Sequence, residues 1–118
     1  VENTTIQRDG KMHLDPFEPE NSLTMVGMLN DRGVERIVTF DHSDVDADDF
    51  GHTVVQEWLD QATIIIAHNA AYDLMWLWES GFKYDGPVFD TMLAEYVLQR
   101  GIKEPLSLEA CAELEGIF

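Results

Sequence analysis

Hydrophobic positions in the first forty residues fall into short runs separated by turn residues, which predicts β-strands. We expect strands around Val1-Glu2 and over 23–29 and 35–40, the last two joined by a turn at Arg32-Gly33. The segment between the first two strands, residues 7–22, is predicted to be a long surface loop. It contains the breaker pairs Asp9-Gly10, Asp15-Pro16 and Glu18-Pro19.

The rest of the chain predicts helices around a single buried strand. Apolar residues recur at helical spacing over 49–61, and the isoleucine run at 64–67 indicates a buried strand. Further helices are expected over 70–80, ended by Gly81, from the cap Asp90 to about Arg100, and after the cap Ser107. In the first two of these three helices we expect the core side to hold Leu74, Met75, Leu77, Trp78, Met92, Leu93, Tyr96 and Val97.

This order of elements predicts an α/β fold. Three strands followed by a strand among helices favour a mixed sheet, with a three-strand antiparallel meander plus parallel strands and helices on its faces. The 118 residues suffice for one domain with a core. Because the chain starts without Met inside a strand and stops abruptly after Gly116, we expect residues 1–118 to be a partial domain.

The charge balance narrows the possible functions. The chain has 23 acidic and 7 basic residues, a net charge of −16, which argues against binding nucleic acid through a broad basic face. It permits a protein that holds divalent cations and meets phosphates through them. No apolar run approaches the roughly 20 residues of a membrane span, no signal peptide is evident, and one cysteine allows no internal disulfide. We therefore expect no membrane partner and a cytoplasmic location, or a phage protein acting in its host's cytoplasm.

Two carboxylates are candidates for chemistry. Asp73 falls in the first turn of the helix after the isoleucine strand, preceded by Tyr72 and by Asn69, which is placed to cap that helix. Glu2 lies on the first strand, and Thr4 after it is a possible cap or ligand contact. A carboxylate at the carboxyl edge of a strand suits metal-dependent chemistry on phosphates. The simpler interpretation is that Asp73 complements the helix dipole and Glu2 is a surface acid.

Other kinds of site fit the residues poorly. In the acidic segment 41–49, counting from Asp44 puts Asp49 rather than Gly at the sixth position of a calcium loop, and counting from Asp46 puts Phe50 at the fifth. The histidines and Cys111 have no zinc spacing. The chain also lacks a nucleophile elbow, a P-loop and a Gly-x-Gly-x-x-Gly motif.

Several segments, in order, resemble the proofreading exonuclease of family A DNA polymerases. The run Asn69-Ala70-Ala71-Tyr72-Asp73 resembles that family's second motif, Asn-x-x-Tyr-Asp. The start, Val1-Glu2-Asn3-Thr4-Thr5, resembles the first motif, Asp-x-Glu, without its leading Asp. Residues 21–27 are similar to the family's second strand, and residues 89–98 and 107–112 to two helices of the domain in bacterial DNA polymerase I. The resemblance covers nearly the whole chain, which looks like the first two-thirds of such a domain.

The resemblance implies a ribonuclease-H-like fold and a 3′-5′ exonuclease that proofreads during DNA replication, with four carboxylates and two Mg²⁺ or Mn²⁺ ions. By this match, Glu2 and Asp73 are catalytic metal ligands, and Asn69, Tyr72 and Thr4 lie on the substrate side. Asp90 matches a position that is not a ligand. The first-motif Asp and the third motif, Tyr-x-x-x-Asp, are absent from this sequence. The implied partners are a single-stranded DNA 3′ end and a polymerase domain C-terminal in the same chain.

Two alternatives within the same fold stay open. One is a non-catalytic domain that binds a nucleic-acid end or a partner, and the other is an exonuclease that trims RNA. An acidic metal-buffering protein is disfavoured by the failed calcium spacing. With half of the ligands missing, we expect this chain alone to show little or no nuclease activity, and we expect Glu2 and Asp73 to face one cleft with their carboxyl groups within about 10 Å.

Overall fold

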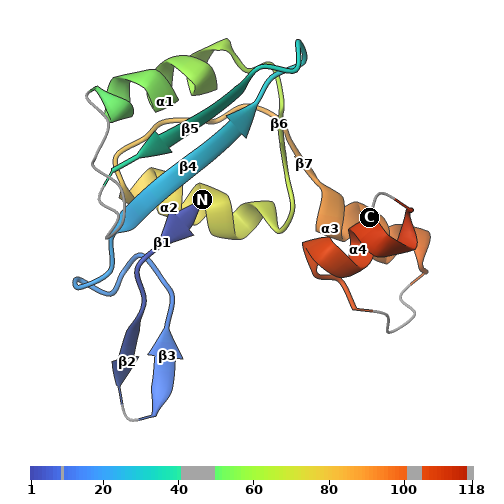
Figure 1. Ribbon diagram of the computed structural model, residues 1–118, viewed down its shortest axis with the longest axis horizontal. Coiled ribbons are helices and arrows are strands. Elements are labelled where there is room, and N and C mark those ends of the chain that lie inside the picture. The colour runs from blue at the N-terminus through green and yellow to red at the C-terminus, as the bar shows by residue number, and fades with distance from the viewer. Residues whose placement is uncertain (9, 41–49, 101–104, 117–118) are drawn as a thin grey trace. The chain divides into compact units, whose positions relative to one another are not determined.

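The computed structural model describes residues 1–8, 10–40, 50–100 and 105–116 (Figure 1). Over these residues the chain forms four helices together with antiparallel and parallel strands, so the predicted α/β class is confirmed. Two compact units divide the chain. The first consists of Val1–Ala62 and Leu74–Asp85, the second of Thr63–Asp73 and Gly86–Phe118.

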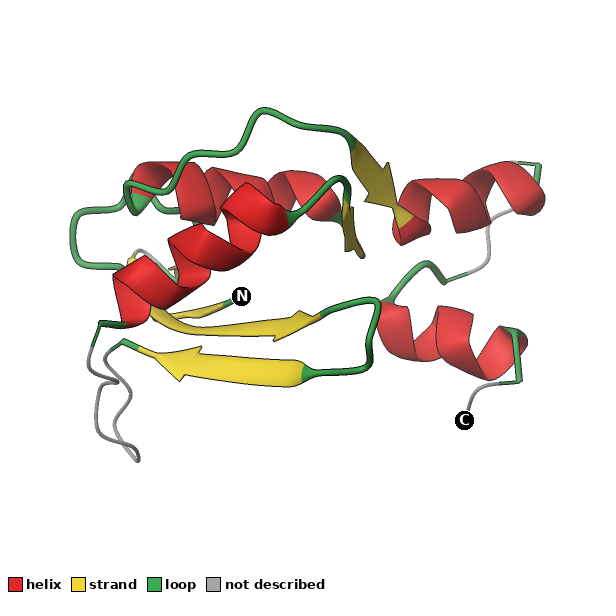
Figure 2. Ribbon diagram, turned by 90° about the horizontal axis from the view of Figure 1, so that it is seen from above, coloured by secondary structure: helices red, strands yellow, loops and turns green. Residues whose placement is uncertain are grey.

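The first unit contains a three-stranded antiparallel sheet with the strand order β1-β4-β5. β1 (Glu2–Asn3) pairs with β4 (Leu23–Leu29), which pairs with β5 (Glu35–Thr39), as Figure 2 shows for the latter two strands. The predicted antiparallel arrangement of these three strands is confirmed. Val26 and Val38 lie opposite each other on β4 and β5, and both are buried, so this cross-strand pair belongs to the core.

A second antiparallel pair occupies part of the segment predicted as a loop. β2 (Ile6–Arg8) pairs with β3 (Lys11–His13), with Arg8 opposite Lys11. The prediction of a loop over 7–22 is therefore wrong at its start. An Asp-Gly pair between strand-forming residues is a strong hairpin signal as well as a break, and Gly10 adopts the left-handed conformation, at φ 74°, that such turns require.

Helix α1 (Gly51–Gln61) packs against β5. Its first residue must be glycine, because a Cβ at Gly51 would lie 2.8 Å from Cγ1 of Val38. Val55 and Leu59, one turn apart, are buried. The helix predicted over 49–61 is thus confirmed from its third residue onward, while residue 49 lies outside the described residues.

Helix α2 (Ala70–Glu79) ends as predicted at Gly81. The N–H of Gly81 donates to the carbonyl of Trp78, and the N–H of Phe82 donates to the carbonyl of Leu77. Together with φ 91° at Gly81, these two bonds form a Schellman motif. Phe82 is buried and stacks on His52 of α1 at 4.2 Å between ring centroids, so this helix end contributes to the core of the first unit.

The core side of α2 differs from the prediction at one tryptophan. Leu74 and Leu77 are buried and Met75 is half-buried, but Trp78 is 54% exposed while Trp76 is 2% exposed. Because α2 is apolar on nearly every side, its periodicity does not favour one tryptophan over the other.

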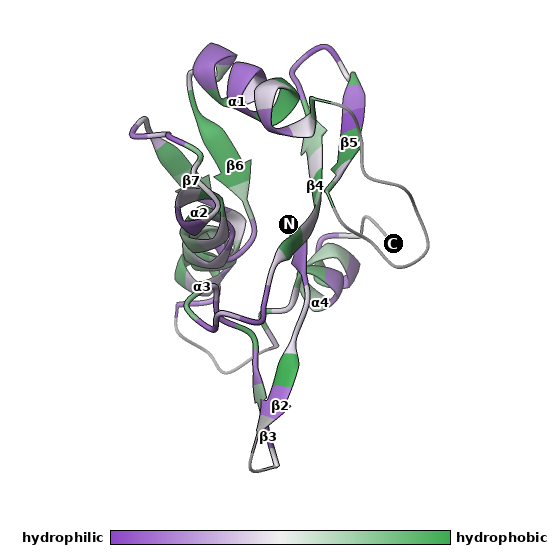
Figure 3. Cartoon of the chain, turned by 90° about the vertical axis from the view of Figure 1, so that its left-hand side faces the viewer, coloured by the Kyte–Doolittle hydropathy of each residue, from purple (hydrophilic) through white to green (hydrophobic). Residues whose placement is uncertain are grey.

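The second unit contains a short parallel sheet. β6 (Ile65–Ala67) pairs with β7 (Val88–Asp90), and Figure 3 shows both strands as largely hydrophobic. β7 was not predicted, because Phe89 and Asp90 were attributed to the segment of the next helix. In the part of the chain that the structure describes, these strands form a sheet of their own rather than an extension of β1-β4-β5. A ribonuclease-H-like arrangement stays a prediction.

Two helices in contact complete the second unit, α3 (Thr91–Leu98) and α4 (Leu108–Leu114). The predicted core side of α3 is wrong for Leu93, Tyr96 and Val97, which are at least half exposed, whereas Met92 is half-buried and Glu95 is buried. Apolar residues occur on every side of this helix, so its periodicity does not favour one face. Among the described residues, no helix is long and apolar enough to cross a membrane.

The Schellman motif gives the first testable prediction. Gly81→Ala is expected to lower the free energy of unfolding by about 1–2 kcal/mol, because an L-residue is strained at this φ angle. Steric crowding is not the cause of the expected loss, since the nearest atom to an added Cβ is Nε2 of His52 at 3.7 Å. Gly27→Ala is the matched control, because a Cβ there meets nothing within 4 Å and φ is ordinary. Equal urea-unfolding curves for the two variants would contradict the prediction.

Candidate functional site

The carboxylate of Asp90 joins the starts of two helices in the second unit. Its Oδ1 accepts N–H bonds from Asn69 at 3.0 Å, Met92 at 2.9 Å and Leu93 at 3.4 Å. Its Oδ2 accepts the N–H of Ala70 at 3.0 Å. The predicted capping of α3 by Asp90 is confirmed, and the same side chain also caps α2. These bonds satisfy N–H groups that a helix start otherwise leaves without a partner.

These hydrogen bonds determine the charge state of Asp90. Burial raises the pKa of this carboxyl, but the bonds from the N–H groups of Ala70, Asn69, Met92 and Leu93 outweigh it and lower the pKa below its ordinary value. Asp90 is therefore ionised at neutral pH, when its negative charge faces the positive ends of two helix dipoles.

Asn69 occupies the position before α2, as predicted for a cap. Its backbone is left-handed, at φ 58°, a conformation that asparagine adopts more readily than most residues. Its carbonyl accepts the N–H of Tyr72 at 3.0 Å. The first N–H groups of the helix, however, bond to the side chain of Asp90. The sequence thus predicted the position of the cap, while the acceptor comes from 21 residues further along.

Asp73 lies in the first turn of α2 and is half-buried. Only His68 and Asn69 separate the end of β6 from the start of this helix. Asp73 therefore follows the carboxyl edge of a strand at short range, which is the arrangement that the sequence predicted. Tyr72, its neighbour, is also half-buried.

The sequence reasoning missed His68. Its ring lies between two partners, the hydroxyl of Thr91 at 3.0 Å from Nδ1 and the carbonyl of Leu106 at 2.6 Å from Nε2. The one available signal was a polar ring placed between an apolar strand and a helix start. The prediction that this strand is buried is wrong, since Ile66 at its centre is exposed.

The remaining predicted residues belong to the first unit. Glu2 is exposed on β1, opposite Met25 of β4. The hydroxyl of Thr4 accepts the N–H of Ser22 at 2.7 Å, and the N–H of Thr4 donates to the carbonyl of Ser22 at 2.9 Å. Thr4 thus has a structural role beside β1, and its contact with DNA stays a prediction. Because Glu2 and Asp73 fall in different units, their convergence also stays a prediction.

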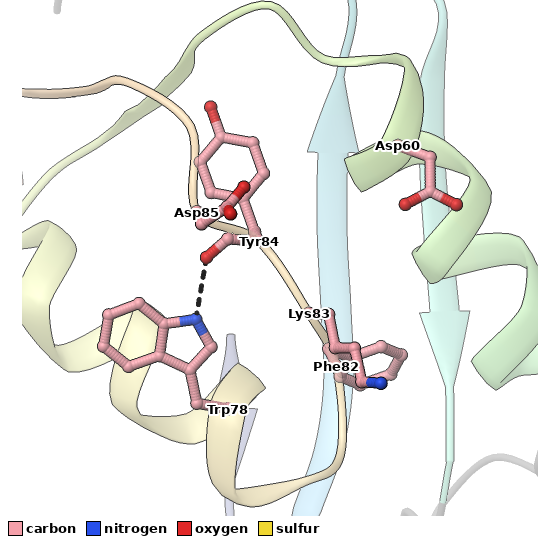
Figure 4. Close-up of a pocket in the computed structure, with 6 residues that line it drawn as sticks. All are labelled: Asp60, Trp78, Phe82, Lys83, Tyr84 and Asp85. Atoms are coloured by element: carbon pink, nitrogen blue, oxygen red, sulfur yellow. Dashed lines mark hydrogen bonds between the residues drawn. The ribbon is translucent and has the colours of Figure 1, made fainter.

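A pocket of about 430 Å³ lies in the first unit and contains none of the predicted site residues (Figure 4). The indole N–H of Trp78 donates to the carbonyl of Tyr84 at 3.1 Å on one side of it. The pocket is lined by Asp60, Trp78, Phe82, Lys83, Tyr84 and Asp85. Its acidic and basic side chains are exposed, which favours an ordinary surface depression over an active site.

The candidate metal ligands fit Mg²⁺ in chemistry, since both are carboxylates and this ion prefers oxygen. Over the described ranges, no group of three or more His, Cys, Asp and Glu side chains is placed to hold a metal ion. The acidic segment 41–49, considered above for calcium, lies outside the described residues.

The double cap gives the second prediction. Asp90→Ala is expected to lower the free energy of unfolding by about 1–2 kcal/mol at pH 7. Because the folded-state pKa of Asp90 is lowered, its stabilisation is complete above the unfolded value of about 3.9 and is lost as pH falls through the folded value. The difference between wild type and variant should therefore shrink in strong acid. Asp31→Ala, which removes an exposed acid, controls for the change in net charge and should show no such pH dependence.

Comparison with known proteins found no relative of this chain. No family model, no curated protein and no solved structure matches the chain.

Proposed function

We propose that this chain is part of a 3′-5′ exonuclease domain, which removes nucleotides from the end of single-stranded DNA as the proofreading part of a DNA polymerase. One observation supports the proposal most. Asp73 ends an Asn-x-x-Tyr-Asp motif at a strand-to-helix junction where the half-buried carboxylate of Asp90 accepts hydrogen bonds from two backbone N–H groups.

In this proposal the chain's own residues hold the reacting groups in place. Glu2 and Asp73 supply carboxylate oxygens, and Asn69 and Tyr72 flank the second of these. When bound, two Mg²⁺ or Mn²⁺ ions supply an activated water and stabilise the leaving 3′ oxygen. Rigid support of Asp73 matters because metal-dependent hydrolysis requires its ligands to be positioned before the substrate arrives.

The proposal also accounts for the charge of the chain. A surface with a net charge of −16 repels the phosphates of DNA. Bound divalent cations reverse the local charge where the carboxylates gather. A single-stranded 3′ end then needs to approach only that one place, and no broad basic face is required.

The third prediction tests the shared metal site without relying on activity. Mn²⁺ should broaden the amide NMR signals of both Glu2 and Asp73 over the same concentration range, because a paramagnetic ion relaxes nearby nuclei. Asp73→Asn should remove the broadening at both residues and weaken Mn²⁺ binding by about tenfold or more. Asp85→Asn, which removes an exposed acid elsewhere, should change neither. Broadening confined to the acidic segment 41–49, or unaffected by Asp73→Asn, would contradict the proposal.

The fourth prediction concerns catalysis. This chain, incubated with a 3′-labelled oligonucleotide and Mn²⁺, should release little or no nucleotide, because it carries two of the four expected carboxylates. A longer chain with an Asp two residues before Glu2 and a Tyr-x-x-x-Asp after Phe118 should digest DNA from its 3′ end. Comparing DNA with RNA on that longer chain distinguishes proofreading from RNA trimming. Metal binding by that longer chain without hydrolysis would instead favour a domain that only binds nucleic-acid ends.

A further inference from the structure

His68 connects three segments of the second unit that are far apart in the sequence. Its ring follows β6, its Nδ1 lies 3.0 Å from Oγ1 of Thr91 at the start of α3, and its Nε2 lies 2.6 Å from the carbonyl oxygen of Leu106. Leu106 stands directly before Ser107, the cap of α4. This one ring thus ties the entrance of α4 to the junction that carries Asp73.

The partners determine which nitrogen carries the proton. A carbonyl oxygen can only accept, so Nε2 must be the donor toward Leu106. In the neutral ring, Nδ1 then accepts a hydrogen bond from the hydroxyl of Thr91. The Thr91 hydroxyl also lies 3.4 Å from the carbonyl of Ala67, a longer and weaker alternative for its proton. Both ring nitrogens are therefore satisfied in one tautomer.

Helix α4 needs this attachment more than a longer helix would. It has seven residues, and a helix so short is unstable in water on its own. The Ser107 hydroxyl caps it by accepting the N–H of Ala110 at 3.2 Å, and its inner side is formed by Cys111 and Ala112, which are buried. If the hydrogen bond between His68 and the carbonyl of Leu106 breaks, the residue directly before the cap loses this contact.

We propose that His68 is a latch that holds α4 in place through the Leu106 carbonyl, and that opening of this latch releases α4 locally while the rest of the chain stays folded. Asp90 makes no bond to α4 among those described, and it fixes the start of α2 independently. The latch therefore controls α4 and not the position of Asp73. This inference goes beyond the proposed nuclease function and does not depend on it.

Cys111 provides a direct readout, because it is the chain's single cysteine and is buried on α4. Burial raises the pKa of its thiol, and the carboxylates of Glu95 and Glu115 raise it further, so the thiol reacts slowly while α4 is closed. The rate at which a thiol reagent labels Cys111 in the native protein then measures how often α4 opens.

Two substitutions of His68 distinguish the roles of its two ring nitrogens. In His68→Gln the side-chain amide nitrogen replaces Nε2 and reaches Leu106, whereas in His68→Asn it replaces Nδ1 and falls short. We expect His68→Asn to label about fivefold to tenfold faster than wild type, as loss of one hydrogen bond implies, and His68→Gln to stay within about twofold of it. Val55→Ala, which weakens the core of the other unit, controls for global unfolding and should leave labelling unchanged in native buffer.

Each other outcome overturns the latch. Labelling of His68→Asn at the wild-type rate, equal rates for His68→Asn and His68→Gln, or equal acceleration by Val55→Ala would each exclude local release controlled by this bond. If His68→Asn does not fold, ¹⁵N NMR of the wild-type imidazole decides the question. The neutral ring must carry its proton on Nε2, and a proton on Nδ1 refutes the proposal.

Discussion

The second unit depends on one half-buried carboxylate that accepts hydrogen bonds from the starts of two helices. Asp90 is the last residue of β7 and pairs with Ala67, the last residue of β6. In a parallel pair the carboxyl ends of both strands lie at the same edge, so the two following helices must start side by side. Both starts expose N–H groups and the positive ends of their dipoles. One carboxylate at the end of the ladder can satisfy them together, and the register of β6 and β7 is what puts Asp90 there.

This arrangement bears on the role of Asp73. The simplest interpretation of an acid in the first turn of a helix is that it complements the dipole. Here Asp90 already supplies a negative charge and two hydrogen bonds at the start of α2. The negative charge that the start of α2 favours is therefore not supplied by Asp73 alone.

The elements that could be predicted from the sequence are those whose signals lie close together along the chain. The strands β4 and β5, the helices α1 and α2, the stop at Gly81 and the caps Asp90 and Ser107 all depend on residues within a few positions of one another. By contrast, β7 is too short to show periodicity, and helices apolar on every side, such as α3, give no preferred face. The partner of His68 is 38 residues away, so no local pattern could have revealed the latch. The pairing of β2 with β3 was missed because a turn signal in the sequence was taken only as a break.

The two carboxylates of the candidate site have very different structural support. Asp73 follows a three-residue parallel ladder whose end is held by four N–H bonds to Asp90, and it lies on a helix of ten residues. Glu2 lies on a strand of two residues with an irregular register, held beside β4 and stabilised by the bonds between Thr4 and Ser22. If both bind the same ion, Glu2 loses more conformational freedom than Asp73 does, and ordering it costs part of the binding free energy. Under the proposed function, the metal affinity would then be limited by the ordering of β1, and the position of the ion would depend on the junction at Asp73.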